Sequence, residues 1–230
     1  MKTEFDYVDE NYKRILFNVN EAKEKNSRKD DIQILAVTKT VDPGVVNHAI
    51  TSCGIRTIGE NRVQEYLSKK DLYKPVSVHF IGQLQTNKVK YIIDSVDMIQ
   101  SLDSIKLASE INRHALRINK IQDVLVEVNI AGEAAKGGVS PDSLEDMLYE
   151  LAQLQNIRVC GLMTVPPVTD TEKFLYKMQK LYIDISDKKI DNINMSFLSM
   201  GMSGDYELAI RYGSNILRIG SALFGARVYK

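Results

Sequence analysis

Short apolar runs alternate with longer amphipathic stretches along almost the whole chain, and this alternation limits the fold more than any other feature. The runs are rich in β-branched residues and have the length of buried strands. We predict strands at Ile32–Val37, Thr57–Ile58, Val76–Ile81, Met98–Leu102, Val124–Ile130, Val159–Val165, Met195–Leu198 and Ile216–Ile219. Because strands that are separated by helices pair in parallel through crossover connections, the pattern predicts an α/β protein.

The stretches between these strands carry apolar residues at three- and four-residue intervals, which is typical of helices that cover a sheet. We predict helices up to about Lys25 and near Pro43–Ser52, Asn61–Lys69, Asn87–Ser95, Ser104–Ile118, Pro141–Gln155, Thr171–Lys188 and Asp205–Tyr212. Eight β/α units in 230 residues suit a (β/α)8 TIM barrel with an extra N-terminal helix. A doubly wound open sheet is the alternative.

Proline positions and composition favour one domain over residues 1–230. The five prolines fall at the predicted element boundaries, where the missing N–H group does least harm. No Gly-, Ser- or Pro-rich linker and no short internal repeat divides the chain. We therefore expect a single barrel domain.

Charge and cysteine content exclude several classes of protein. The chain has 30 Lys and Arg residues against 30 Asp and Glu residues, so it offers no overall basic charge for nucleic-acid binding. Its two cysteines cannot form a disulfide framework, its N-terminal segment does not resemble a signal peptide, and no apolar run spans a bilayer. These features predict a soluble cytoplasmic protein with neither nucleic acid nor membrane as a partner.

Two glycine-rich segments lie at the carboxyl ends of the last two predicted strands, at residues 199–204 (SMGMSG) and 218–221 (RIGS). In a TIM barrel, the loops at these places form a phosphate site from backbone N–H groups. Ser203 and Ser221 would add hydroxyl donors. The alternative is that the glycines only permit tight turns between strand and helix. The two loops taken together favour a phosphate site.

Lys39 follows the apolar run IQILAV with only Thr38 between them, so a barrel places it at the mouth of the strand ring. An amine held there is a competent nucleophile toward an aldehyde. The alternative is an ordinary solvated lysine at a strand end. A lysine and a phosphate site across one barrel mouth are the two features that pyridoxal phosphate requires, so their combination predicts this cofactor.

Three further polar residues end predicted strands, but each has an ordinary structural explanation. His79 could orient a cofactor or a water molecule, but a single histidine at the end of a strand is more often a hydrogen-bonded structural residue. Asn61 and Asn129 could bond a ring substituent, although asparagine at a strand end also caps helices routinely.

Six stretches carry a resemblance to a known family. They are AVTKTVDP (36–43), IGENRVQE (58–65), HFIGQLQTNK (79–88), GLMTVPP (161–167), LSMGMSGDYELAI (198–210) and LRIGSALFGAR (217–227). In this order they closely resemble the pyridoxal-phosphate homeostasis proteins, which are single-domain relatives of the alanine racemase barrel. The resemblance runs from about residue 5 to residue 227.

The resemblance implies a role for each matching residue. Lys39 would be the Schiff-base lysine, and Ser203 with the Gly220–Ser221 turn would hold the phosphate. Asn61 would contact the ring. By similarity to the racemase barrel, Arg218 would face the pyridine nitrogen of the cofactor.

The loop after the fifth predicted strand contains a second lysine. Lys136 matches a family lysine there, and we hypothesise that this second amine assists cofactor handover. The chain departs from the family at Val78, where an aromatic residue is usual, and at Ala131, where a polar residue is more typical. Neither departure affects Lys39 or the predicted phosphate loops.

The resemblance also implies a carrier rather than an enzyme. A guanidinium opposite the pyridine nitrogen stays protonated, so it keeps that nitrogen unprotonated and makes the ring a poor electron sink. Racemases of this fold use a second base from another domain, and we expect this chain, which ends at Lys230, to lack that domain. We therefore predict a monomeric protein that buffers pyridoxal 5'-phosphate or delivers it to apo-enzymes. The alternatives are a weak amino-acid racemase and, less favoured, a phosphosugar enzyme.

Overall fold

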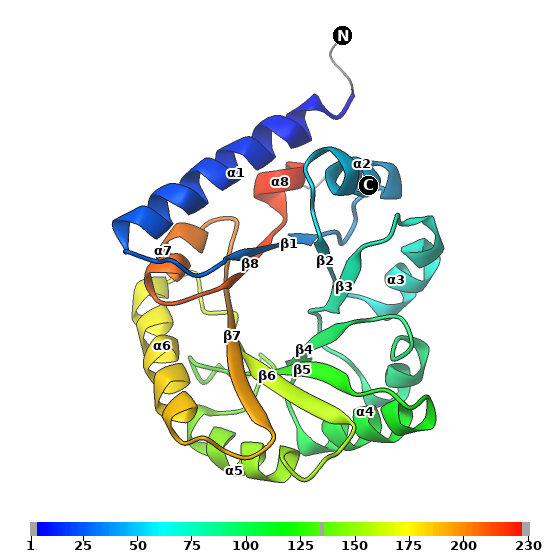
Figure 1. The fold of residues 1–230 in the computed structure, drawn as a ribbon, viewed down its shortest axis with the longest axis vertical. Coiled ribbons are helices and arrows are strands. Elements are labelled where there is room, and N and C mark those ends of the chain that lie inside the picture. Colours follow the sequence, from blue (N-terminus) through cyan, green and yellow to red (C-terminus); the bar gives the residue numbers. More distant parts are fainter. Residues whose placement is uncertain (1–3, 134–135, 227–230) are drawn as a thin grey trace.

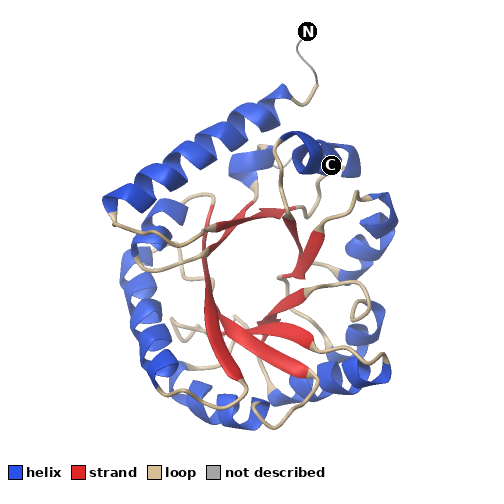
Figure 2. Cartoon of the chain, viewed as in Figure 1, coloured by secondary structure: helices blue, strands red, loops and turns tan. Residues whose placement is uncertain are grey.

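The computed structural model describes residues 4–133 and 136–226, and in them eight parallel strands close into a barrel. Each strand pairs with the next one along the chain, and β8 pairs back to β1. Figure 2 shows the ring of strands surrounded by helices. The predicted TIM barrel is confirmed, and the doubly wound alternative is wrong because an open sheet has no pairing between its first and last strands.

The strands and helices alternate as the sequence predicted (Figure 1). The strands are β1 (Gln33–Val37), β2 (Thr57–Glu60), β3 (Ser77–Phe80), β4 (Met98–Leu102), β5 (Gln122–Glu127), β6 (Ile157–Met163), β7 (Ile193–Met202) and β8 (Ile216–Ile219). The α-helices are α1 (Asp6–Lys25), α2 (Pro43–Ser52), α3 (Val63–Lys69), α4 (Ile105–Arg117), α5 (Pro141–Leu151), α6 (Thr171–Asp187), α7 (Tyr206–Arg211) and α8 (Ser221–Phe224). Two 3-10 helices, η1 (Lys70–Leu72) and η2 (Thr86–Tyr91), complete the described elements.

Successive residues of a strand point to opposite faces, and this divides the buried apolar residues into two clusters. Leu35 and Val37 of β1 meet Leu125 of β5 and Ile216 of β8 in the smaller cluster, which fills the inside of the barrel. Ala36, between the two β1 residues, belongs to the larger cluster that joins the strands to the helices. The strands are therefore apolar on both faces, which explains why they read as continuous apolar runs.

Many elements differ from their predicted extents by a few residues, and four of these differences lie near the barrel mouth or change the type of element. The strand predicted at Met195–Leu198 runs from Ile193 to Met202, so the first part of the glycine-rich segment is strand rather than loop. β2 likewise continues to Glu60, whereas β5 stops at Glu127. The helix predicted near Asn87–Ser95 is the shorter 3-10 helix η2, in a segment where β-branched residues lower the helix propensity.

The predicted N-terminal helix lies outside the barrel and packs beside α7 and α8 (Figure 1). Asn11 Nδ2 donates to the carbonyl oxygen of Leu223 in α8 at 3.0 Å. Asn18 Nδ2 donates to the Tyr206 hydroxyl of α7 at 2.9 Å. These contacts hold α1 against the helices that follow the last two strands. Among the described residues, no helix has the length and apolar character that crossing a membrane requires.

Candidate functional site

One cavity of about 420 Å³ opens at the carboxyl ends of the strands, and all six residues predicted to hold a cofactor line it. They are Lys39, Asn61, Ser203, Arg218, Gly220 and Ser221. Val37, Ile81, Val165 and Met202 supply apolar walls that the sequence analysis did not single out. A volume of this size suits a small organic ligand. Closure of the barrel therefore brings together residues from β1, β2, β7, β8 and the loops that follow them.

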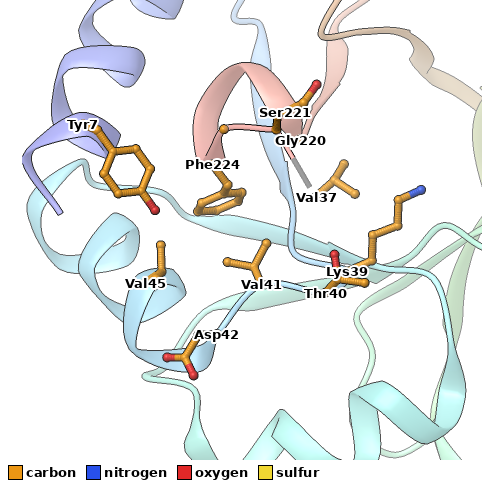
Figure 3. Close-up of a pocket in the computed structure, with 12 residues that line it drawn as sticks. Tyr7, Val37, Lys39, Thr40, Val41, Asp42, Val45, Gly220, Ser221 and Phe224 are labelled. Carbon is orange, nitrogen blue, oxygen red and sulfur yellow. The ribbon is translucent and has the colours of Figure 1, made fainter. Parts of the chain in front are cut away.

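Lys39 stands on a turn directly after β1. Thr38, before it, is fully buried and donates its hydroxyl to Glu60 Oε1 at 2.6 Å. Lys39 also borders a smaller cavity of about 220 Å³ that reaches the side of α1 and α8. Figure 3 shows Tyr7 and Phe224 in that smaller cavity, with the Lys39 amine pointing away from both. The amine thus points away from α1, and Lys39 also lines the larger cavity.

The ends of β7 and β8 meet through the hydroxyl of Ser203. Its oxygen accepts hydrogen bonds from the backbone N–H groups of Gly220 at 3.2 Å and Ala222 at 3.1 Å. Asp205 Oδ1 accepts from the Met202 N–H at 2.6 Å, which fixes the turn that carries Ser203. Ser203 and Gly220 line the cavity, and the two N–H groups that meet the Ser203 oxygen here are donors of the kind that suits the oxygens of a phosphate.

Arg218 is almost fully buried on β8, with 4% of its surface exposed. Its Nη1 donates to the Ser199 hydroxyl and its Nη2 to the Thr164 carbonyl oxygen, both at 2.7 Å. Burial lowers the pKa of Arg218 to about 10, an effect that the negative charges of Glu127 and Asp205 partly offset. The guanidinium therefore remains a charged donor at neutral pH, held in a fixed plane at the edge of the cavity.

A chain of hydrogen bonds continues from Arg218 across the barrel interior. The Ser199 hydroxyl donates to Gln100 Oε1 at 2.7 Å, and Gln100 Nε2 lies 2.8 Å from His79 Nδ1. Because the amide nitrogen of Gln100 is a donor, His79 Nδ1 accepts and the ring proton is assigned to Nε2. Burial lowers the pKa of His79 to about 4, so the ring is neutral. We call these four side chains the interior network.

His79 does not line the cavity. The structure therefore places it where the hydrogen-bonded structural alternative expects it, inside the barrel and next to Gln100. Gln100 and Ser199 complete the interior network, but Gln100 was not predicted from the sequence and Ser199 was noted only as part of the glycine-rich segment 199–204. A polar residue within a predicted buried strand is the signal that could have found Gln100, because such residues need partners.

Asn61 follows β2, and its Oδ1 atom is buried with no hydrogen-bond partner among the described residues. The backbone of Asn61 can lie this close to Gly82 only because glycine has no side chain. A Cβ atom at position 82 would lie 2.1 Å from the Asn61 carbonyl oxygen. An unpartnered buried acceptor at a cavity wall is a favourable contact for a ligand donor, because leaving it unpaired costs free energy.

Glu60, which precedes Asn61, was not among the predicted site residues. It is fully buried, and its Oε1 accepts from the Thr38 and Tyr73 hydroxyls, the latter at 2.7 Å. Burial raises the pKa of Glu60, although these two hydrogen bonds and the charge of Lys69 act in the opposite direction. Glu60 therefore anchors Thr38, and with it the start of the turn that carries Lys39.

Lys136 and Asn129 lie in the loop after β5 and do not line the cavity. Lys136 Nζ pairs with Glu133 Oε1 at 2.8 Å. Asn129 Nδ2 donates to the backbone of the same loop, at Glu133 and Lys136. In this structure Asn129 therefore organises the loop instead of contacting a ligand. Residues 134 and 135 of the loop, and Arg227 at the end of the last resembling stretch, lie outside the described residues.

The chemistry of the cavity fits pyridoxal phosphate. It combines a primary amine, a phosphate-type donor set, a charged guanidinium and an unpartnered amide oxygen within one small space. Apolar walls from Val37, Ile81 and Val165 suit the faces of a flat ring. The phosphate, the aldehyde and the ring nitrogen of such a ligand would therefore each have a matching group among the residues that line the cavity.

Comparison with known proteins identifies relatives over almost the whole chain. The family model for the alanine racemase N-terminal domain matches residues 11–228. A pyridoxal phosphate homeostasis protein from Aquifex aeolicus is 42% identical over 227 residues, covering 96% of this chain and 98% of the relative.

Solved structures agree with this relationship. PipY of Synechococcus elongatus, in the structure with PLP bound, is 28% identical with a TM-score of 0.75, over 90% of this chain and 100% of that one. Alanine racemase from Clostridium difficile shares the fold at 19% identity and a TM-score of 0.73, over 96% of this chain and 58% of that one.

Proposed function

Because the chain belongs to the family of pyridoxal phosphate homeostasis proteins, we propose that it binds pyridoxal 5'-phosphate and buffers or delivers this cofactor. The observation that carries the proposal is the single cavity that Lys39, Ser203, Gly220 and Arg218 line together. The bound cofactor of PipY, a relative with the same fold, supports it.

Each cavity residue has a role in this proposal. Ser203, Gly220 and Ser221 hold the phosphate through hydroxyl and backbone donors, and Asn61 contacts the ring. Arg218 donates to the pyridine nitrogen from a guanidinium that Ser199 and Thr164 keep in place. When bound, pyridoxal phosphate supplies an aldehyde carbon that condenses with a primary amine and loses its oxygen as one water molecule. Lys39 is the amine that borders this cavity.

Arg218 favours storage of the cofactor over catalysis with it. A charged donor at the pyridine nitrogen keeps that nitrogen unprotonated, and an unprotonated ring withdraws electrons weakly. Burial lowers the pKa of Arg218 only to about 10, so the guanidinium does not give up its proton at neutral pH. We propose that the protein lacks substantial catalytic activity, acts as a single-domain monomer over residues 1–230 in the cytoplasm, and passes the cofactor to apo-enzymes.

Reduction with borohydride tests cofactor, lysine and cavity together. Purified protein is incubated with pyridoxal phosphate, reduced and digested, and the modified peptide is identified by mass spectrometry. We expect modification at Lys39, loss of it in Lys39→Ala, and no change in Lys136→Ala, since Lys136 lies outside the cavity. Modification that persists in Lys39→Ala, or that is absent from the wild type, contradicts the proposed site.

A second measurement separates carrier from racemase. Loaded protein is incubated with L-alanine, and the D-enantiomer is followed by chiral chromatography. Turnover at an ordinary enzyme rate, about 1–10³ per second, would show that the carrier proposal is wrong. We expect the accumulation of D-alanine to stay far below that range.

A further inference from the structure

The turn that carries Lys39 has a strained backbone. The Val41 N–H group donates to the Thr38 carbonyl oxygen at 3.0 Å, which closes a β-turn with Lys39 at its second position. Thr40, at the third position, has a φ of +64°. A positive φ at this position defines the type II class of turn and normally calls for glycine or asparagine. For a β-branched residue such as threonine it is a clear outlier.

Two side chains of α3 hold this turn. Glu65 Oε1 accepts from the Thr40 backbone N–H group at 2.5 Å and from Lys69 Nζ at 2.6 Å. Lys69 Nζ also donates to the Val41 carbonyl oxygen at 2.9 Å. The Lys69 and Glu65 side chains are only 15% and 17% exposed, so water and salt weaken these contacts less than they weaken those of a surface pair.

The bond from Thr40 to Glu65 distinguishes between two forms of the turn. Type I and type II turns differ by a flip of their central peptide, which here joins Lys39 to Thr40. In the observed form the N–H group of this peptide meets the Glu65 carboxylate. The flipped form would turn the Lys39 carbonyl oxygen toward the same carboxylate, where two acceptors repel. The carboxylate therefore stabilises the strained form and disfavours the relaxed one.

Glu65 keeps its charge in this position. Burial alone would raise the pKa of Glu65, but the hydrogen bonds from Lys69 and from the Thr40 N–H group outweigh it and hold the pKa below its ordinary value. Backbone strain that neighbouring groups maintain clusters at active sites and ligand-binding positions. The residue at such a position here is Lys39, which follows the fully buried Thr38.

We propose that Glu65, supported by Lys69, is a positioning residue that keeps the Thr38–Val41 turn in its strained form and thereby directs Lys39 into the cavity. This inference deepens the proposed function and rests on it, because the direction of Lys39 matters for condensation with the aldehyde. Glu65 itself does not line the cavity, so it acts through the turn.

Two readouts test the proposal in the full chain. The first is the rate at which visible absorbance appears after mixing with pyridoxal phosphate, and the second is hydrogen exchange of the Thr40 amide by NMR without ligand. In Glu65→Ala we expect the rate to fall about tenfold, the factor by which a left-handed conformation is disfavoured for an L-residue, and the Thr40 amide to lose its protection. Glu65→Gln keeps an acceptor oxygen and should restore most of both.

Thr40→Gly provides the decisive rescue. Glycine adopts a positive φ without steric cost, so in the Glu65→Ala background it should return the rate to within about threefold of wild type. Glu21→Ala is the matched control, because it removes another Glu–Lys pair at i,i+4 spacing, on α1. Neither readout should change in that variant.

Several results would overturn the proposal. They are an unchanged rate and unchanged Thr40 protection in Glu65→Ala, equal loss in Glu65→Gln, or no recovery with Thr40→Gly. If the wild-type protein forms no Lys39 adduct, the proposed function is wrong, but the role of Glu65 is not affected by that result. The protection of the Thr40 amide in the ligand-free protein then decides whether Glu65 holds the turn.

Discussion

At the scale of single residues, the shape of the cavity depends on a glycine that has no side chain as well as on the side chains that line the cavity. Asn61 presents an unpartnered oxygen to the cavity, and its backbone lies where it does because Gly82 has no side chain. Gly204, at the same mouth, has open space around its Cβ direction instead. Both glycines belong to loops at strand ends, but only Gly82 stands where a side chain would collide with a neighbouring loop.

Gly82→Ala should weaken ligand binding by displacing Asn61. The added Cβ atom would lie 2.1 Å from the Asn61 carbonyl oxygen, so the backbone must shift. We expect the affinity for pyridoxal phosphate to fall at least tenfold, or by about 1.4 kcal/mol, measured by fluorescence titration. Gly137→Ala is the control and should bind like the wild type, because Gly137 does not line the cavity and a Cβ atom there would come no closer than 3.6 Å to another atom. Equal affinities of Gly82→Ala and wild type would show that the position of Asn61 does not matter.

At the scale of elements, four strands each contribute one side chain to the interior network. His79 lies on β3, Gln100 on β4, Ser199 on β7 and Arg218 on β8. The hydrogen bond between Ser199 and Gln100 spans 99 positions of sequence, and it exists because the barrel closes. Ser101, next to Gln100 on β4, is also buried but has no partner among the described residues. Of these two polar neighbours on β4, only Gln100 forms side-chain hydrogen bonds to other strands.

Gln100→Leu should destabilise the fold because it removes the acceptor of the Ser199 hydroxyl proton and the donor to His79 Nδ1, although Ser199 still accepts from Arg218. A buried polar group that loses its hydrogen bond costs about 1–3 kcal/mol, so we expect the free energy of unfolding to fall by roughly 2–4 kcal/mol, measured by urea denaturation. Ser101→Ala removes a hydroxyl of the same strand that has no partner, and its effect should stay below about 1 kcal/mol. Similar losses in both variants would contradict the importance of the interior network.

At the scale of the whole molecule, the barrel interior contains both an apolar cluster and a set of hydrogen-bonded polar side chains. The smaller apolar cluster packs around Leu35, Leu125 and Ile216, and the interior network crosses the same space. His79 is therefore kept neutral by burial, with its pKa lowered from 6.5 to about 4. The nearby charges of Asp97 and Asp123 raise this pKa but do not compensate for burial. The stability of the molecule then depends on pH through a residue that does not touch the cavity.

We expect the free energy of unfolding to fall as the pH drops from about 6.5 to about 4. In that window the unfolded chain binds a proton on His79 and the folded protein does not, so acid favours unfolding, by up to about 3 kcal/mol. His79→Asn keeps an acceptor for Gln100 and cannot titrate there. Its urea denaturation at pH 7 and pH 4.5 should show a smaller difference than the wild type. Identical pH dependence in the two proteins would contradict a neutral buried His79.

The sequence by itself determined the class of fold and the chemistry of the cavity, because both depend on local patterns. Alternating β-branched runs and amphipathic stretches specify strands and helices, and residues that directly follow strands of a parallel barrel must meet at one mouth. Lys39, Asn61 and Ser203 could therefore be expected together, whereas Arg218 was expected from the family resemblance, and the binding roles of all four stay predictions. The extra length of β7 was missed, because strand ends depend on pairing with neighbours.

Only the tertiary structure decided what holds these residues in place. Glu65 reaches Thr40 across 25 positions, and Gly82 meets Asn61 through a contact between two loops. Such contacts follow from barrel closure and strand register, which no local pattern encodes. Residue types and spacing thus predict which groups are available at the mouth. Packing between distant segments determines the direction in which each group points. The same packing maintains the strained turn that carries Lys39.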